Sequence, residues 1–489
     1  MTTSVLPAPQ AAPPAPPPAT RPQPGPPDRP STSRRLRLRT VPGRIRAWAA
    51  AAVVALVVLF ALATMAIGDA RDGLYVVGKG AGRQVVATAD LYYALSDMDT
   101  QVANMLLIGE ERLGGGREQA MARYEQSRAN ASEALLQAAD LADDDTERAT
   151  VRSLLNKLGE YERRAGQALL LDDRADHPAG PPSDPEVLRL YREATNLMRL
   201  ELLPQAYNLT LDNGVIVRRG YEEQHAAVQT GRVAVAIAGL VTLVLLVGLQ
   251  VYLARRFRRI LNPALLAATI VVTVLVGLVM GLLDREAANL RTAKEDGFNS
   301  VLALARARAI SNSLHGDQSR YLLDPAGADT YEQVYLDKSQ RVLHTDAGNL
   351  DKYYASLRTI LKEYPEKVTF LGLLGDEANN ARTKAHRDAL AETLERYEIF
   401  QQSDRRLRLM KQSDQVQAVR FRMADVSRTF EEYDKSLMAL ADSHERTLRA
   451  AIDDGDAALA GWDYILPAAV LATVALIFVG VRPRLQEYR

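Results

Sequence analysis

Four long apolar stretches that contain no charged residue constrain this chain more than any other feature. They are residues 47–68, 233–254, 263–283 and 464–481. A helix needs roughly 20 apolar residues to cross the hydrocarbon core of a bilayer, so each stretch predicts one transmembrane helix. The first stretch is too long for a signal peptide and has no convincing cleavage site, so we interpret it as an uncleaved anchor. The sequence therefore predicts a four-span membrane protein.

The orientation of the spans follows from the arginines. They cluster before the first span, between the second and third, and after the fourth. Four spans place all three clusters on one side, and the positive-inside rule assigns that side to the cytoplasm. We therefore expect a multi-pass protein of the cell membrane with both termini in the cytoplasm. The arginines that carry this assignment are Arg34, Arg35, Arg37, Arg39, Arg255, Arg256, Arg258, Arg259, Arg482 and Arg484.

The spans and their orientation divide the chain into nine predicted regions. The expected order is a proline-rich cytoplasmic tail with a basic anchor, a span, an extracytoplasmic segment, a span, a basic loop, a span, a second extracytoplasmic segment, a span and a short tail. The corresponding residues are 1–46, 47–68, 69–231, 232–254, 255–262, 263–283, 284–463, 464–481 and 482–489.

The net charge is zero, because 60 Lys and Arg residues balance 60 Asp and Glu residues. Nucleic-acid-binding domains are usually strongly basic, so no nucleic-acid partner is expected. The balance conceals a separation, since the cytoplasmic segments are net basic and both external segments are net acidic. Basic inner segments suit anionic membrane lipids. The absence of cysteine excludes a disulfide scaffold, thiolate catalysis and Cys-ligated metals.

Residues 1–33 are rich in proline and almost free of large apolar residues. Such a segment cannot bury enough surface to fold, so it is predicted to be disordered and to sample extended polyproline conformations. Two interpretations stay open for this tail. It is either a spacer or a docking arm for a cytoplasmic partner.

Both external segments are predicted to be helical. In the first, apolar residues recur every three or four positions from Leu91 to Met105, which is typical of one buried helix face. Breaks at residues 110–118, 143–147 and 172–185 divide the segment into four helices. Because both ends of the segment join spans, we expect an up-down-up-down bundle that stands on two transmembrane helices.

The second external segment follows the same plan. It continues from the third span, turns at residues 324–329, and returns to the membrane in a long helix that is expected to begin near Asp404. Leu95–Ile108 aligns with Ile310–Leu323 at an offset of 215 positions. The fold class predicted is thus an all-α membrane protein with four transmembrane helices and two extracytoplasmic helical bundles, related by tandem duplication.

The chain offers little catalytic chemistry. Its six histidines are scattered, and Glu222 and His225 form only half of the carboxylate and histidine motif of a di-iron bundle. We therefore expect no enzyme activity, no metal and no cofactor. The spans hold no ionisable group at membrane depth, which pumps and proton-coupled transporters need. This disfavours a transporter.

Two small sets of residues are candidates for contacts. Gly277 and Gly281 form a Gly-x-x-x-Gly pair in the third span that would let another helix approach closely. The alternative is that small residues are simply common in alanine-rich spans. Asp97, Asp99 and Asn104 form a polar stripe that could dock a partner, or that is an ordinary solvated helix surface.

Three runs of residues resemble a known family. They are Leu95–Gly109, the loop Arg255–Pro263 and the C-terminal run Val481–Arg489. These resemble an actinobacterial family of four-span membrane proteins that are often encoded beside a glutamine-binding lipoprotein and protein kinase G. The resemblance implies a relay in which the lipoprotein senses an amino acid such as glutamine or aspartate. This chain would couple across the membrane to the cytoplasmic Ser/Thr kinase.

Two functions are therefore weighed. The first is a non-enzymatic transmembrane signal transducer, because nearly all the folded mass is outside and the cytoplasmic parts are too small for a kinase or cyclase domain. Its expected partners are membrane lipids, a solute-binding lipoprotein outside and a Ser/Thr kinase inside. The alternative is a structural or assembly scaffold of the cell envelope. The sequence does not fix the oligomeric state.

Overall fold

The computed structural model describes most of the chain. The described residues are 41–78, 81–111, 115–142, 145–174, 177–257 and 262–486. The proline-rich tail, Arg34, Arg35, Arg37, Arg39, Arg258 and Arg259 lie outside these ranges. In the described part the chain folds into helices without a β-strand, and an isolated bridge joins His344 and Leu371. The predicted all-α class is confirmed.

The described part of the first half of the chain forms the long helix α1, four shorter helices and a very long helix that returns. The elements are α1 (Val41–Gly78), α2 (Ala81–Ile108), α3 (Gly116–Leu141), α4 (Asp145–Asp172), α5 (Pro185–Leu197), the π-helical turn η2 (Met198–Leu202) and α6 (Leu203–Phe257). Asp184 caps α5 by accepting a hydrogen bond from the Glu186 N–H, and Pro185 occupies the first helical position. The predicted breaks between these helices are confirmed.

The second half repeats this plan with extra short helices. Its first elements are α7 (Pro263–Thr292), η3 (Ala293–Phe298), α8 (Asn299–Leu323), η4 (Pro325–Gly327) and α9 (Ala328–Val342). The remaining elements are α10 (Leu350–Glu363), α11 (Leu373–Asn380), α12 (Lys384–Ser413), α13 (Gln415–Phe421), η5 (Arg422–Val426), α14 (Ser427–Leu459) and α15 (Trp462–Gln486). A helix start near Asp404 is wrong, because α12 runs through that residue and the chain turns at Asp414 instead.

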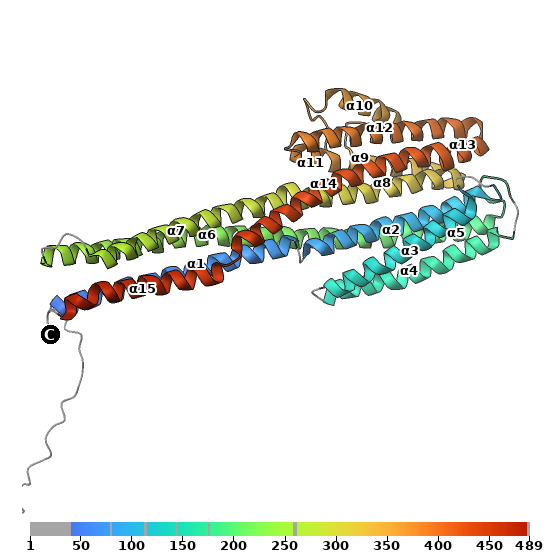
Figure 1. Cartoon of the computed structure of the whole chain (residues 1–489). Helices are drawn as coiled ribbons and strands as arrows, with labels where there is room; N and C mark the ends of the chain where they lie inside the picture. Colours follow the sequence, from blue (N-terminus) through green and yellow to red (C-terminus); the bar gives the residue numbers. More distant parts are fainter. Residues whose placement is uncertain are drawn as a thin grey trace, which may run out of the picture.

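Among the described residues, four helices are long and apolar enough to cross a membrane, and the apolar stretches lie in α1, α6, α7 and α15. They form a bundle at one end of the elongated molecule (Figure 1). Glycines let these helices approach closely, since a Cβ at Gly239 would lie 2.8 Å from Val276 and one at Gly248 would lie 2.9 Å from Trp48. One end of this bundle lies farthest from the rest of the molecule (Figure 1). It contains the start of α1, the end of α6, the start of α7 and the end of α15.

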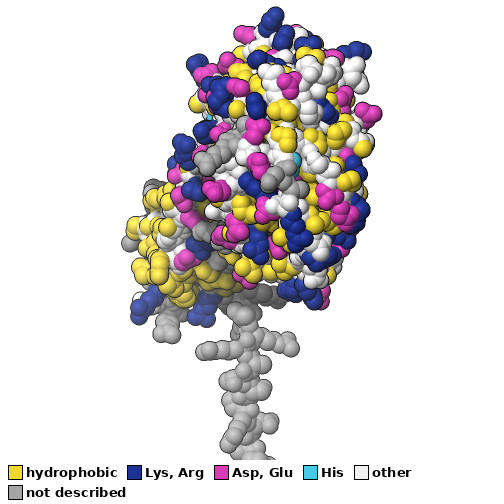
Figure 2. Space-filling model, turned by 90° about the vertical axis from the view of Figure 1, so that its right-hand side faces the viewer, with side chains coloured by type: hydrophobic (Ala, Val, Ile, Leu, Met, Phe, Trp, Pro, Cys, Tyr) yellow, Lys and Arg dark blue, Asp and Glu magenta, His cyan; other side chains and the backbone are white. Residues whose placement is uncertain are grey.

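The two segments that were expected to lie outside the cell pack into one body, called the external body below, rather than into two separate bundles. Helices α2 and α8 lie against each other along their length, and a single apolar core contains residues of both segments. The reason is visible in α2, where the residues from Val102 to Ile108 are buried on every side of the helix. A helix that is apolar all round needs neighbours all round. Acidic and basic side chains are interspersed over the end of this body that faces away from the spans (Figure 2).

The register of the α2–α8 pair follows the predicted alignment at an offset of 215 positions. Both helices run away from the membrane, and they end at Ile108 and Leu323, which are equivalent in the repeat. Asn104 and Ser319 are also equivalent, and their side chains are hydrogen-bonded to each other. The Arg308 guanidinium lies 4.1 Å from the ring centroid of Tyr93, its equivalent in α2. Equivalent residues meet in this way when two related elements pack around a local twofold axis.

Long helices connect this external body to the spans. Helical structure is continuous from Pro185 to Arg256 and from Pro263 to Leu323. The π-helical turns η2, η3 and η5 interrupt the regular α-helical hydrogen bonding within these connections and within the helix that leads to α15. Such turns are often found at functional sites, because they change the phase of a helix locally.

Candidate functional site

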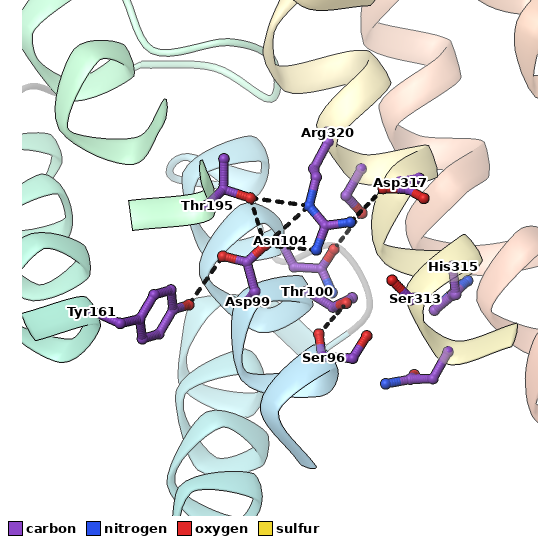
Figure 3. Close-up of polar contacts among 12 residues, drawn as sticks. Ser96, Asp99, Thr100, Asn104, Tyr161, Thr195, Ser313, His315, Asp317 and Arg320 are labelled. Carbon is purple, nitrogen blue, oxygen red and sulfur yellow. Dashed lines mark hydrogen bonds and ion pairs between the residues drawn. The ribbon is translucent and has the colours of Figure 1, made fainter. Parts of the chain in front are cut away.

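A cluster of charged side chains lies inside the external body, where α2 meets α8 (Figure 3). Asp99 comes from α2, Asp317 and Arg320 come from α8, and Lys338 comes from α9. Asp99, Asp317 and Arg320 are all 0% exposed. Two carboxylates therefore face two cations, and only the Lys338 side chain of these four is partly exposed, at 15%.

Arg320 joins the two halves of the chain. Its Nε and Nη2 donate hydrogen bonds to Oδ2 of Asp99 over 3.0 and 2.6 Å. Its Nη1 donates to Oδ1 of Asp317 over 2.5 Å, one helical turn earlier in α8. Figure 3 shows the guanidinium between these two carboxylates. A guanidinium is suited to this position because its planar fork of donors can serve two acceptors at once.

Neutral donors complete the surroundings of Asp99. Tyr161 of α4 donates to Oδ1 over 3.1 Å, and Thr195 of α5 donates to Oδ2 over 2.7 Å. The Asp99 carboxylate thus links α2, α4, α5 and α8 through hydrogen bonds. Charges that are buried in this way are tolerated only when they are paired and hydrogen-bonded.

Lys338 closes the other side of the cluster. Its ammonium group donates to Oδ2 of Asp317 and, over 2.7 Å, to the Ser313 hydroxyl. Burial lowers the pKa of Lys338 to about 8, and the neighbouring Asp317 opposes that shift. The ammonium group therefore depends on Asp317 to remain charged in this environment.

The cluster is present on one side of the local twofold axis only. The repeat equivalents of Asp99 and Arg320 are Leu314 and Met105, and both of these residues are fully buried and apolar. The ionic contact between Asp99 and Arg320 thus corresponds to an apolar pair, Leu314 and Met105, across the axis. The two halves are not interchangeable at this contact, because the charges of Asp99 and Arg320 have no charged counterparts across the axis.

The polar stripe predicted to dock a partner does not form an exposed surface. Asp99 belongs to the buried cluster, and Asn104 accepts a hydrogen bond from Ser319 over 2.7 Å while only 8% exposed. Asp97 is half-buried and accepts hydrogen bonds from Ser127 and Gln101. The prediction of an exposed stripe is therefore wrong for Asp99 and Asn104, since α8 covers that face of α2.

The predicted helix-packing glycines contact no other part of the described chain. A Cβ added at Gly277 or at Gly281 would meet nothing within 4 Å. The two residues lie on an exposed face of α7. The close approaches between spans occur instead at other glycines, such as Gly239 and Gly248. Of the topology arginines that the structure describes, Arg255, Arg256 and Arg482 are exposed.

A second buried polar group lies where the external body approaches the spans. Nδ1 of His444 in α14 lies 2.7 Å from the Asp296 carbonyl oxygen, and its Nε2 lies 2.7 Å from Oε1 of Glu377. A carbonyl only accepts, so Nδ1 carries a proton, and a further proton must lie between Nε2 and the carboxyl group. The ring of His386 packs against this imidazole at 4.1 Å between centroids.

Sequence reasoning missed Arg320, Asp317 and Lys338. One pattern could have indicated them. The residues from Asp317 to Arg320 are four consecutive polar residues in a helix that otherwise contains apolar residues. All four residues are buried. In the part of the chain that the structure describes, no group of three or more metal-ligating side chains is placed to hold a metal ion.

Fold and site together define a multi-pass helical membrane protein with a large helical body beyond the spans. Residues 73–222 match the family model of the actinobacterial sensor domain. The match spans the first external segment, from the end of α1 to the middle of α6, and includes Asp99 and its partners in α4 and α5. It supports a role in sensing and signal transduction. No curated protein and no solved structure matches the chain.

Proposed function

We propose that this chain is a non-enzymatic transmembrane signal transducer. In this proposal a binding lipoprotein outside the cell senses glutamine or aspartate, and this protein passes its state to a Ser/Thr kinase in the cytoplasm. Both partners are those that the sequence resemblance implies. The basic ends of the spans, with Arg255, Arg256 and Arg482, would lie on the cytoplasmic side.

One observation carries the proposal. The contact between the two halves of the external body contains a buried ionic cluster, and two of the helices that supply it, α8 and α5, continue to the spans. Buried ion pairs are sensitive to geometry, because a small displacement leaves a charge without its partner. The contact between α2 and α8 is therefore suited to two discrete arrangements rather than to gradual deformation.

The mechanism follows from the connections. Docking of a loaded binding protein would favour one arrangement of α2 against α8. The accompanying helix shift, on the order of 1–2 Å, would pass along α5, η2 and α6 and along α8, η3 and α7 to the cytoplasmic ends of the spans. The π-helical turns supply positions where a helix changes its phase.

The test measures phosphorylation of the kinase's substrates in cells, with and without external glutamine or aspartate. Deleting the gene is expected to abolish the response, and the wild-type gene is expected to restore it. Arg320→Met should restore membrane localisation but not the response, whereas Arg163→Met, at an exposed position of α4, should restore both. An unchanged response in the deletion strain would contradict the relay and favour a scaffold of the cell envelope.

A further inference from the structure

A buried carboxyl group lies at the junction between the external body and the spans. Glu286 of α7 follows the last residue of the third apolar stretch by three positions, and only 1% of it is exposed. Neither of its carboxyl oxygens has a hydrogen-bond partner in the part of the chain that the structure describes. The relay proposed above assigns no role to this residue.

Three helices enclose the Glu286 carboxyl group. A Cβ at Gly455 of α14 would lie 2.9 Å from Oε2 of Glu286, and it would also contact Leu74 of α1. The backbone of α14 thus comes this close to the carboxyl group because residue 455 has no side chain. Removing an ionised carboxylate from water is strongly unfavourable unless a cation or several donors compensate it. The packing of this junction therefore suits the neutral carboxylic acid and not the carboxylate.

The acidic neighbours of Glu286 also favour its neutral form. Burial raises the pKa of Glu286 to about 7, the charge of Asp456 in α14 adds to the shift, and the Asn289 amide opposes it. Asp456 and Asp72 of α1 line a hollow of about 320 Å³ beside the junction, together with Leu74. Water in this hollow therefore reaches the immediate neighbours of Glu286 and can exchange protons with the junction.

The cations of the adjacent helices are engaged elsewhere. Arg71 of α1 donates to both carboxyl oxygens of Asp463, over 2.9 and 3.0 Å. Arg232 of α6 is paired with Asp284, which precedes Glu286 by two positions in α7. Neither guanidinium neutralises Glu286 in this arrangement. An ionised Glu286 would thus need water to enter between the helices.

The helix that carries Gly455 is interrupted before it reaches the membrane. Helix α14 ends at Leu459 and α15 begins at Trp462. Between them Gly461 has a φ of +83°, the left-handed conformation that commonly ends a helix. Nη2 of Arg71 also donates to the Leu459 carbonyl over 3.1 Å. A change in the packing of α14 at Gly455 can therefore be taken up at this break, because α15 is not a rigid continuation of α14.

We propose that Glu286 makes the junction of α1, α7 and α14 sensitive to the pH on the side of the external body. The packed junction holds the protonated carboxyl group, and ionisation of Glu286 admits water and moves α14 away from α7. Protonation stabilises the packed junction fully below about pH 4.5, the pKa of an ordinary glutamate, and this stabilisation is lost as the pH rises through about 7. The response is independent of the relay, because it requires no partner protein.

The experiment measures the separation of the two helices in the full chain, reconstituted in lipid nanodiscs. Ala288→Cys in α7 and Ala457→Cys in α14 are exposed positions for a pair of spin labels, in a chain that has no other cysteine. Their distance is determined by electron paramagnetic resonance from about pH 5 to about pH 9, a range that brackets the Glu286 pKa. We expect the mean distance to increase by about 2 Å with rising pH. The midpoint is expected near pH 7.

Three variants identify the titrating group. Glu286→Gln keeps the size of the side chain without its charge, so it should give the low-pH distance at every pH. Asp456→Asn removes the neighbouring negative charge and should move the midpoint to lower pH. Asp454→Asn, at an exposed position next to Gly455, is the matched control and should leave the midpoint unchanged.

The proposal is overturned by a distance that does not change with pH, by an unchanged pH dependence in Glu286→Gln, or by an unchanged midpoint in Asp456→Asn. The Asp456→Asn result decides even where Glu286→Gln does not fold. Neither a binding protein nor a kinase is present in the nanodisc, so failure of this experiment leaves the proposed relay intact.

Discussion

Arg320 and Asp99 are sealed from water, so each depends on the other for the neutralisation that solvent would otherwise provide. Arg320 also serves Asp317, which Lys338 shares. Removing one charge from this balanced set leaves another buried without a partner, whereas removing one charge of each sign leaves Asp317 paired with Lys338. The effects of removing Arg320 and removing Asp99 are therefore not expected to add. The double variant should lose less stability than the sum of the two single variants.

We predict that Arg320→Met lowers the free energy of unfolding by about 3–5 kcal/mol, the range for breaking a buried ion pair. Adding Asp99→Asn should restore part of this loss, because the remaining Asp317 and Lys338 neutralise each other. Thermal unfolding of the detergent-solubilised protein measures both effects, with Arg163→Met as the exposed control. Purely additive losses in the double variant would show that the charges do not act as one cluster.

The histidine pair predicts a dependence of stability on pH. Burial lowers the pKa of His386, and the neighbouring His444 opposes its protonation further. The unfolded chain therefore takes up this proton first as the pH falls. The stability that neutral His386 supplies is present above about pH 6.5, the pKa of an unperturbed histidine, and is lost as the pH falls through the folded pKa. The charges of Glu377 and Asp296 oppose this lowering of the His386 pKa but are smaller effects than burial.

His386→Phe keeps a ring against His444 and removes the titrating group. We predict that the loss of stability between pH 7 and pH 5 becomes less steep in this variant. His344→Phe, at an exposed histidine, should leave the slope unchanged. Melting temperatures measured across this pH range test the prediction, and equal slopes in the wild type and His386→Phe would contradict it.

Helices α2 and α8 approach each other closely because one residue in their contact is glycine. A Cβ at Gly316 would lie 2.4 Å from the Thr100 hydroxyl oxygen, which donates a hydrogen bond to the Ser96 carbonyl. The hydroxyl cannot rotate away without losing that bond. The close packing of α2 against α8 thus requires that residue 316 has no side chain.

Gly316→Ala is therefore expected to lower the free energy of unfolding by about 1–3 kcal/mol, as overpacking typically does. Combining it with Thr100→Ala should recover much of the loss, since the obstructing oxygen is then gone. Gly277→Ala is the matched control, because a Cβ there meets nothing within 4 Å. The account of this contact is wrong if Gly316→Ala is as mild as Gly277→Ala.

The sequence predicted the elements better than their assembly. Turn-forming segments located the ends of α2, α3 and α4, and the spans followed from uninterrupted apolar runs. The joint body was missed because the stripe from Leu91 to Met105 was interpreted as one buried face. The apolar run that ends at Ile108 already indicated a helix enclosed on all sides. The ionic cluster could not be predicted, because Asp99 and Arg320 are more than 200 residues apart and no periodicity pairs them.

In the whole molecule, the α2 and α8 helices pack around one local axis, and four helices of the described chain are long and apolar enough to cross a membrane. Residues that the predicted repeat makes equivalent lie side by side at the centre, and the charges lie on one side of the axis only. This arrangement makes the α2–α8 contact the natural place for two alternative states.

The most direct test fixes the α2–α8 register covalently. The chain has no cysteine, so Asn104→Cys with Ser319→Cys introduces the only possible disulfide, between residues whose side chains are already in contact. Phosphorylation of the kinase's substrates is then measured with and without external glutamine, before and after reduction. We predict that the oxidised variant gives the same signal in both conditions, and that reduction or either single substitution restores the difference. A full glutamine response in the fully oxidised protein would contradict the central claim.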